Sequence, residues 1–530
     1  MKISRMAPAA LMAFAALLLN SCTTTTPGLV HGDSRPAAQR LSQTPTWSKN
    51  DMQFFLHGTM STEFVPENLL RAFVRANPDL FPKADLSHFG LIPDPSFGWP
   101  IGFSRRTVPH LAGLPAVGVN CASCHSAEIV SASGDRSVRV LGVTSHIDAE
   151  AFFGAILVST FRTADPANME KVLAARVSDA GGSPAVFKGI WAAQQREIIG
   201  AMTADPFGAA GVSPGEMHSI QAKDLEVEGH ADLLPAIRAT LKLCHNIRAA
   251  VHVPDQPPEK APPASGPGRN DAFGLLSLML LGQPQPYGPV KYGLVWNLEK
   301  RHWVHWDGNT QSPIGRNLLA SLGLGAALSG NRGQLEFAKI QRQTALSERI
   351  QAPRYPFAID AAAARRGGAH YQARCASCHD GPETDQCLHS PDEIGTDPGR
   401  ARFFTAPQAA GFNAFLAKLE APGYTPSKEL GIRATQKYLA PRLAGVWARS
   451  PYLHNGSVRT MEELLSPNAA RAKTFRRGSK RFDEARMGYT DEGAYVLDTT
   501  QPGNGNSGHN YGQDLSDPQR HELIEYLKTL

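Results

Sequence analysis

The pentapeptide Cys121-Ala122-Ser123-Cys124-His125 occurs a second time, letter for letter, as Cys375-Ala376-Ser377-Cys378-His379. Cys-x-x-Cys-His is the attachment pattern of c-type haem. Its two thiols bond to the two vinyl groups of one ring, and the adjacent histidine then binds the iron as an axial ligand. A redox dithiol does not need the histidine, and a zinc site would need a second ligand pair at short spacing. The repeat therefore predicts two covalently bound haem c groups, with His125 and His379 on the irons.

The composition is that of a globular protein with many loops. The chain has 530 residues, of which 42% are hydrophobic, with 48 glycines and 40 prolines. This length predicts two to four domains. A net charge of +5 is too small for this length to indicate a nucleic-acid partner, and it fits either an acidic redox partner or no charged partner at all.

Residues 1–22 read as a targeting segment. A charged start is followed by an apolar run at residues 10–19, and the segment closes on Cys22. This resembles a bacterial lipoprotein signal whose cysteine becomes lipidated, with residues 23–45 as a tether. An ordinary secretory signal with a chance cysteine is the alternative. Thr23, in place of aspartate, favours the outer membrane. No later stretch is apolar enough to span a bilayer, so we expect a periplasm-facing lipoprotein.

Two cysteines remain after the lipid site and the two pentapeptides, namely Cys244 and Cys387. An oxidising compartment would allow them to form a disulfide. The sequence does not show that they meet, so both states stay open.

A second repeated element follows each haem motif. Val295-Trp296 aligns with Val446-Trp447, and Trp306-Asp307-Gly308 aligns with His454-Asn455-Gly456. Asp-Gly and Asn-Gly are also ordinary turn dipeptides, but the matching order favours two cytochrome modules of common descent.

The modules are expected to be mainly α-helical, with small helices and long loops around each haem. We place an N-terminal cytochrome c-like module at residues 46–345 and a C-terminal one at residues 355–530. The first carries a large insertion at about residues 150–265, which is either part of a substrate cavity or a decoration far from the iron. Helices are predicted at residues 66–76, after Asn317 and at residues 518–530.

Several blocks resemble the rubber-oxygenase-like diheme cytochromes, which are distantly related to the bacterial diheme cytochrome c peroxidases and to the diheme enzyme that matures tryptophan tryptophylquinone. The blocks are GWPIGFSRR (residues 98–106), GVNCASCH (118–125), HWDGN (305–309), SPYLHNGSVRTMEELL (450–465) and DTTQPGNGNSGHNYGQDLS (498–516). The resemblance runs from about residue 50 to the end of the chain. It is specific for the superfamily and less so for one activity.

The resemblance implies that the two haems differ. The N-terminal haem would be the reactive one, with a site for oxygen or peroxide, and the C-terminal haem would be six-coordinate and transfer electrons. The peroxidases use a methionine as second ligand, and the matching stretch here, residues 462–468, has none. The oxygenase-like members use a histidine, for which His509 is the candidate. His454 and Met487 are the alternatives, since an electron-transfer haem needs a strong-field sixth ligand.

Three aromatic or imidazole side chains are candidates for roles near the first haem. These families place a tryptophan between their haems, so Trp296 is a candidate electron relay, although a core tryptophan would look the same. His302 and His305 flank Trp303 and could act as acid or base, because the unperturbed pKa of histidine lies near neutrality. The alternative for both is a hydrogen bond to a propionate or to the backbone.

Three functions follow as hypotheses. The first is an exported haem-dependent oxidoreductase, peroxidase-like or oxygenase-like, served by a small redox partner protein. The second is a diheme electron-transfer protein without chemistry of its own. The third is a haem-bearing sensor or assembly factor that docks through residues 150–265. The size favours the first, because simple electron transfer needs only about 100 residues per haem.

Overall fold

The computed structural model describes residues 38–108, 111, 113–162, 168, 171–172, 175, 264–283, 285–301, 303–326, 335–381, 387–419 and 431–530. Cys22, Cys244, His302 and most of the expected insertion at 150–265 lie outside these residues. Among the described residues, no helix has the length and apolarity needed to cross a bilayer.

This part of the chain contains α-helices and short turns of 3₁₀ and π-helix. The α-helices are α2 (Lys49–His57), α3 (Glu67–Ala76), α4 (Cys121–Cys124), α5 (Ala149–Arg162), α10 (Ala272–Leu276), α11 (Pro313–Ser321), α12 (Phe337–Glu348), α13 (Ala361–Arg374), α14 (Ala376–His379), α15 (Pro391–Ile394), α16 (Gly399–Phe403), α17 (Ala406–Ala417), α18 (Met461–Leu464) and α19 (Asp517–Lys528). The 3₁₀ and π-helical turns are η1 (Pro82–Ala84), η2 (Leu86–Phe89), η6 (Ser277–Leu281), η7 (Leu298–Lys300), η8 (Leu322–Ala326), η11 (Val446–Arg449) and η12 (Asn468–Ala470).

Fourteen short strands alternate with these helices in the described residues. They are β1 (Gln39–Arg40), β2 (Val65–Pro66), β3 (Phe103–Val108), β4 (Leu114–Val119), β5 (Ser126–Ser131), β6 (Ser137–Leu141), β7 (Arg269–Asn270), β8 (Val290–Lys291), β9 (Leu388–His389), β10 (Tyr438–Leu439), β11 (Thr474–Arg477), β12 (Arg481–Asp483), β13 (Gly488–Tyr489) and β14 (Tyr495–Asp498). They form five sheets, the largest in the order β1-β6-β5-β12-β13.

The predicted helices at 66–76 and near the C-terminus are confirmed as α3 and α19. The helix expected after Asn317 is α11, which begins four residues earlier at Pro313 because Ser312 caps it by accepting from the Gly315 N–H. Proline at the first helical position fits there, since that N–H has no partner inside a helix.

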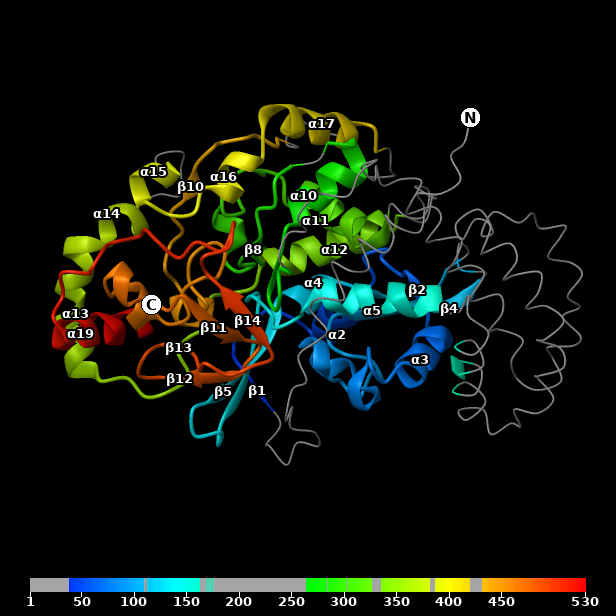
Figure 1. Ribbon diagram of the computed structural model, residues 1–530, viewed down its shortest axis with the longest axis horizontal. Helices are drawn as coiled ribbons and strands as arrows, with labels where there is room; N and C mark the ends of the chain where they lie inside the picture. Colours follow the sequence, from blue (N-terminus) through cyan, green and yellow to red (C-terminus); the bar gives the residue numbers. More distant parts are fainter. Residues whose placement is uncertain are drawn as a thin grey trace, which may run out of the picture.

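The prediction of a mainly α fold made of two cytochrome c-like modules is wrong. β5, next to the first haem motif, pairs in parallel with β12, far beyond the second motif, and the two therefore share one sheet (Figure 1). One buried core also joins both ends of the chain, from Phe55 on α2 to Leu527 on α19. The strands are two to six residues long. Most are too short to show the alternation of apolar and polar residues by which a strand is recognised in a sequence.

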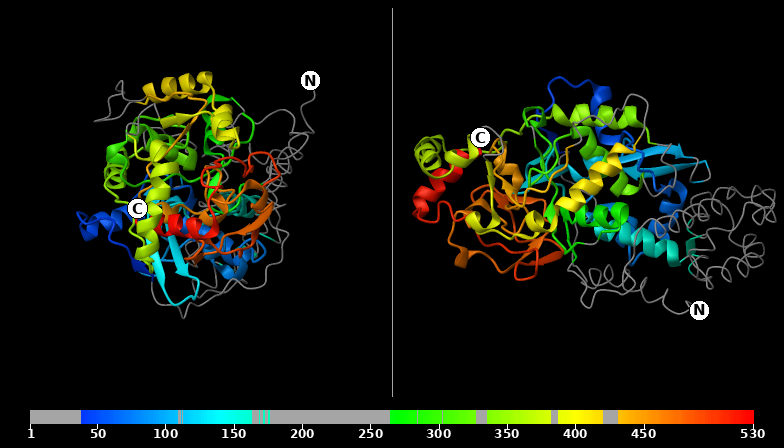
Figure 2. Two further views of the ribbon diagram at one scale, coloured as in Figure 1. Left: turned by 90° about the vertical axis from the view of Figure 1, so that its left-hand side faces the viewer. Right: turned by 90° about the horizontal axis from the view of Figure 1, so that it is seen from above.

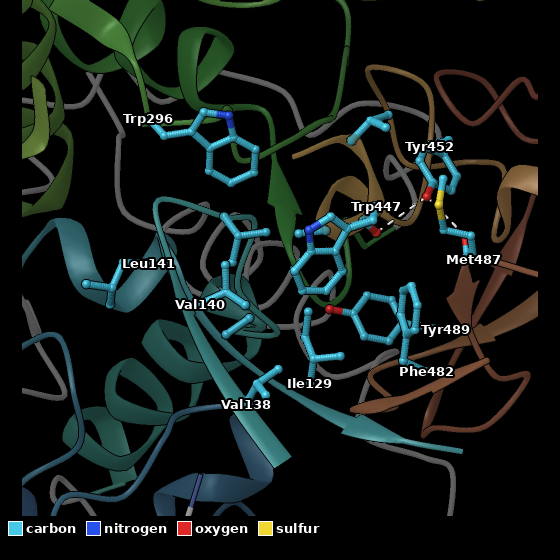
Figure 3. Close-up of a cluster of buried hydrophobic side chains, with 14 of the residues drawn as sticks. Ile129, Val138, Val140, Leu141, Trp296, Trp447, Tyr452, Phe482, Met487 and Tyr489 are labelled. Atoms are coloured by element: carbon cyan, nitrogen blue, oxygen red, sulfur yellow. Dashed lines mark hydrogen bonds between the residues drawn. The ribbon is translucent and has the colours of Figure 1, made fainter. Parts of the chain in front are cut away.

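The two segments with the Val-Trp pattern meet in this shared core. Figure 3 shows Trp296 and Trp447 in one cluster, next to Val138 and Val140 of β6 and Ile129 of β5. Both indoles are fully buried, and each donates its N–H to a backbone carbonyl, Trp296 to Ala444 at 3.2 Å and Trp447 to Pro353 at 2.9 Å.

The second haem motif is carried by a helix pair at one end of the molecule. α13 packs along α19, and the two lie together in all views (Figures 1 and 2). Gly367 of α13 permits this approach, because a Cβ at that position would overlap the carbonyl oxygen of Glu522. Asp360 caps the start of α13 by accepting from two backbone N–H groups. The pair therefore forms a fixed support for Cys375 and His379.

Candidate haem sites

The first motif forms the one-turn helix α4 directly after β4. Asn120 caps it by accepting from the Ala122 N–H at 2.9 Å, and its amide donates to the Gly58 carbonyl at 2.9 Å. Gly102, with φ 89°, lies so close that a Cβ there would overlap the backbone of Ser123. These contacts fix the motif between α2 and β4, so that its side chains face a preformed surface.

A backbone hydrogen bond holds His125, whose side chain is half-buried. Its carbonyl accepts from the Gly142 N–H at 2.7 Å, and its Nδ1 is buried without a hydrogen-bond partner. Burial first, and the charge of Arg316 second, lower its pKa to about 4. The imidazole is therefore neutral at physiological pH, the form that binds a metal ion.

The cysteines of the first motif lie between apolar surfaces. Burial raises the pKa of both Cys121 and Cys124 to about 11, so both thiols are neutral. Neutral thiols in apolar surroundings are compatible with thioether bonds to the apolar haem ring. Met60 Sδ lies 3.3 Å from Cys121 Sγ. Tyr292, whose ring centre is 6.3 Å from that of His125, also faces Cys124. Met60 and Tyr292 thus flank the edge where the thioether bonds would form.

The second motif continues from α13 into α14. His379 Nδ1 lies 2.7 Å from the carbonyl oxygen of Pro441. Since a carbonyl only accepts, Nδ1 carries the proton and Nε2 keeps its lone pair for a metal. Burial lowers the pKa of His379 below its usual value, which keeps this ring neutral as well.

His509 faces His379 across a short gap. The two ring centres are 6.3 Å apart, with the ring planes tilted by 48°. Imidazole nitrogens bind metal ions at about 2 Å, and a ring centre lies about 1 Å behind its nitrogen, so two rings on one ion have centres about 6 Å apart. His509 Nδ1 is buried with no hydrogen-bond partner. The pair therefore fits two axial ligands of one haem iron.

The loop that carries His509 is anchored on both sides. The His509 N–H donates to the Ile394 carbonyl at 2.7 Å, and Gly508 lies so close to Gly395 that a Cβ would overlap that backbone. Arg471 donates to the carbonyls of Asn506 and Gly508 at 2.6 and 2.8 Å. The histidine is thus held in place by backbone contacts. Burial and the charge of His379 lower its pKa to about 4.

The two alternative ligands have other contacts. His454 stacks on Tyr438 with ring centres 4.3 Å apart, and its Nε2 lies 3.0 Å from the tyrosine hydroxyl. Met487 is buried beside Tyr452, whose hydroxyl donates to the Met487 carbonyl at 3.0 Å (Figure 3). Of the three candidate ligands, His509 therefore lies next to His379, whereas His454 contacts Tyr438 and Met487 contacts Tyr452.

Trp296 and His305 occupy different places. Trp296 lies in the shared core under Gly445, where φ is 68° and a Cβ would come 3.1 Å from the indole. His305 is half-buried with φ 71°, and its Nδ1 lies 2.8 Å from Asn309 Oδ1. Its ring meets the Phe273 ring edge-on at 5.3 Å.

Lys291 is a buried cation that the sequence patterns did not single out. Its ammonium donates to the carbonyls of Arg449 and Pro451, and its own carbonyl accepts from the Trp306 indole at 2.9 Å. Burial first, and the charge of Arg449 second, lower its pKa well below the usual value. It lies next to Tyr292 in the sequence, so it joins the segment near His125 to the Arg449–Pro451 segment. A lone lysine in a short strand gives no motif that could have revealed it.

Comparison with known proteins gives a family match and two relatives. Residues 437–476 match the family described as RoxA-like, cytochrome c-like. This segment holds Pro441, the partner of His379, and the buried Trp447. The match supports the rubber-oxygenase-like cytochrome family and implies covalently bound haem c.

The two relatives come from Sinorhizobium fredii (strain NBRC 101917 / NGR234). Uncharacterized protein y4iJ is 30% identical over 357 residues, and the match covers 50% of this chain and 60% of y4iJ. Uncharacterized protein y4iM is 30% identical over 320 residues, and the match covers 52% of this chain and 72% of y4iM. The chain thus spans less than two thirds of the length of y4iJ and more than two thirds of that of y4iM.

Proposed function

This chain belongs to one protein family with y4iM, and we propose that it is a haem-dependent oxidoreductase with two covalently bound haem c groups. Cys121 and Cys124 hold the first haem, with His125 as its axial ligand. Cys375 and Cys378 hold the second, between His379 and His509. The RoxA-like cytochrome c match supports haem c as the cofactor. The presence of two Cys-x-x-Cys-His motifs supports two haem groups per chain.

The observation that carries the proposal is the difference between the two histidine environments. His379 has His509 at 6.3 Å between ring centres, a pair that saturates an iron and suits electron transfer. Among the described residues, the ring of His125 pairs with that of Tyr292 and not with a second histidine, and Met60 lies at the cysteine edge of the motif. We therefore propose that the first haem keeps one free axial position. A haem bound there would supply a site for oxygen or peroxide.

Trp296 and the shared core would connect the two sites. The indole N–H donates to Ala444, a few residues from Pro441, which binds His379. Arg449 lies over the Trp296 ring at 5.8 Å. Trp296 is therefore proposed as the electron relay between a reactive first haem and an electron-transferring second haem. A small redox protein would deliver the electrons.

The spin and ligation state of each haem tests this proposal. In the ferric protein we expect one low-spin bis-histidine haem and one high-spin haem by electron paramagnetic resonance. The reduced protein should bind one carbon monoxide per chain. Met60→Leu serves as a control and should leave both signals unchanged, because Met60 lies at the thioether edge. Two low-spin haems that bind no carbon monoxide, in the ferric, half-reduced and fully reduced protein, would instead identify a non-catalytic electron-transfer protein.

Export with a lipid anchor on Cys22 is proposed from the N-terminal sequence. Labelling of cells with a fatty-acid analogue should mark the chain and not the variant Cys22→Ser. The anchored protein should fractionate with the outer membrane. An unlabelled chain would reduce the segment to an ordinary secretory signal.

A further inference from the structure

Two buried N–H groups near the first haem motif have no hydrogen-bond partner. They are Arg316 Nη2 on α11 and Asn309 Nδ2 in the loop before it. Asn309 is 0% exposed and Arg316 is 9% exposed. Buried donors are almost always satisfied in folded proteins, because removal from water without a partner costs free energy. Two such donors in one place indicate a ligand that accepts hydrogen bonds.

The surrounding contacts place these donors beside the first motif. Cys121 packs against an apolar cluster that includes Met60, Phe273 and Leu318, and Leu318 lies on the same helix as Arg316. Phe273 in turn meets His305 edge-on. Burial is the main cause that lowers the pKa of both His125 and His305, and the charge of Arg316 adds to it at each ring, in line with these contacts. Arg316, Asn309 and His305 therefore form one group on the α11 side of the motif.

Each member of this group is held in a fixed orientation. Asn309 Oδ1 accepts from the Thr310 hydroxyl at 2.9 Å and from His305 Nδ1 at 2.8 Å. Its NH₂ group is therefore the end that remains to donate. Arg316 Nε donates to Asn317 Oδ1 at 3.1 Å, and Asn317 donates to Thr344 at 2.7 Å. His305 keeps Nε2 as an acceptor, because its Nδ1 carries the proton.

We propose that Arg316, Asn309 and His305 line the free face of the first haem and bind a small polar ligand of the hydrogen peroxide class. This inference rests on the proposed function, because it presumes a haem on Cys121 and Cys124 with one open axial position. Arg316 and Asn309 donate to the ligand oxygen, and His305 Nε2 accepts a hydrogen bond from its O–H group. An apolar polymer would cover the two donors and leave them unpaired, so this face selects a small polar oxidant.

The test uses the holoprotein with fluoride and carbon monoxide as probes. Fluoride accepts strong hydrogen bonds, so Arg316→Gln and Asn309→Ala should each weaken its binding to the ferric protein by about tenfold or more. The same variants should raise the C–O stretching frequency of the reduced carbon monoxide complex, because donors to the bound ligand lower it. Arg349→Gln, which removes an exposed charge on the neighbouring α12 segment, should change neither quantity.

The outcomes separate this inference from the proposed function. The low-spin signal of the His379–His509 haem must persist in every variant, which shows that the fold is intact. If Arg316→Gln shifts a reduction potential but neither fluoride affinity nor the C–O stretch, Arg316 binds a haem propionate and the inference fails. If the unmodified protein binds neither probe, the open position itself is absent and the proposed function fails first.

Discussion

His509 has a backbone conformation that side chains rarely adopt, with φ 50°. Such conformations cost free energy and persist where the surroundings enforce them. Here the enforcing contacts are the hydrogen bond to Ile394, the close approach of Gly508 to Gly395 and the two hydrogen bonds from Arg471. The loop thus presents an imidazole to His379 at a fixed distance. A rigid pair would suit the proposed electron transfer, because neither oxidation state would require the iron to change its ligands.

Replacing this histidine should open the second haem. In His509→Ala we expect the low-spin ferric signal to become high-spin, because only His379 would remain on that iron. Carbon monoxide binding should rise from one to two per reduced chain. Spectroscopic titration measures both. His454→Gln is the control, since His454 bonds to Tyr438 instead. An unchanged low-spin signal in His509→Ala would show that another residue ligates the second haem.

Glu150 is a second residue whose burial has a measurable consequence. Burial raises its pKa to about 7, although the N–H of Ser265 donates to its carboxylate at 2.8 Å and opposes the shift; the nearby Asp148 charge raises it further. The folded protein therefore holds a proton that the unfolded chain, with a pKa near 4.5, has already released. The stability that this proton provides is complete below pH 4.5 and is lost as the pH rises through 7.

Glu150→Gln should remove this part of the pH dependence. Between pH 4.5 and 8, the unfolding free energy of the wild type should fall relative to that of the variant by about 3 kcal/mol, given 1.4 kcal/mol per pKa unit. Denaturant melts over this pH range measure the difference. Glu492→Gln, at an exposed position, should behave like the wild type. Parallel curves for wild type and Glu150→Gln would mean that Glu150 is ionised in the folded protein.

At the scale of elements, the helix pair α13 and α19 supports the second haem motif. α13 runs directly into Cys375, so any displacement of the helix displaces the cysteines and His379. Arg366 and His370 of α13 both contact Glu522 of α19. The close approach at Gly367 has no room for a side chain, which makes this glycine a packing residue of the site.

Two neighbouring glycines provide a matched test of this packing. Gly367→Ala would place a methyl group on the Glu522 carbonyl, so it should lower the melting temperature and broaden the low-spin haem signal. Gly368→Ala would place its methyl group 3.4 Å from the Tyr526 ring, an ordinary contact. It should be neutral or stabilising by up to about 1 kcal/mol, the usual gain of alanine over glycine in a helix. Equal effects of both substitutions would contradict the close packing.

The sequence predicted the parts of the site and the fold that local patterns encode. The amphipathic segments at α3 and α19 were found, because helical periodicity shows within ten residues. The two pentapeptides give the haem motifs, because their chemistry fixes the spacing. The β5–β12 pairing joins residues about 350 positions apart, and β12 has only three residues, so no local sequence pattern indicates the pairing. Arg316 and Asn309 were missed because only burial without a partner distinguishes them.

At the scale of the whole molecule, both haem motifs share one structural unit. β5 starts directly after His125, and β12 and β13 from the C-terminal part of the chain belong to the same sheet. Trp296 and Trp447 pack in the same core, next to strands of that sheet (Figure 3). Two sites that depend on one core cannot lose their structure separately. The two modules placed at residues 46–345 and 355–530 stay predictions. In the structure, residues of both ranges pack in one core and pair in one sheet.

A single substitution in the shared core should therefore destabilise both haem sites together. Phe482 of β12 is fully buried, with its ring centre 6.0 Å from that of Trp447 and 5.8 Å from that of Tyr489. Phe482→Ala should lower the unfolding free energy by about 3–5 kcal/mol, as large-to-small core substitutions do. Thermal melts followed at the low-spin and high-spin haem bands should show one transition, shifted equally at both bands. Val496→Ala on β14, where the side chain is half exposed, should shift neither. Two separate transitions, with only one moved by Phe482→Ala, would show that the haem sites unfold as independent units despite the common sheet.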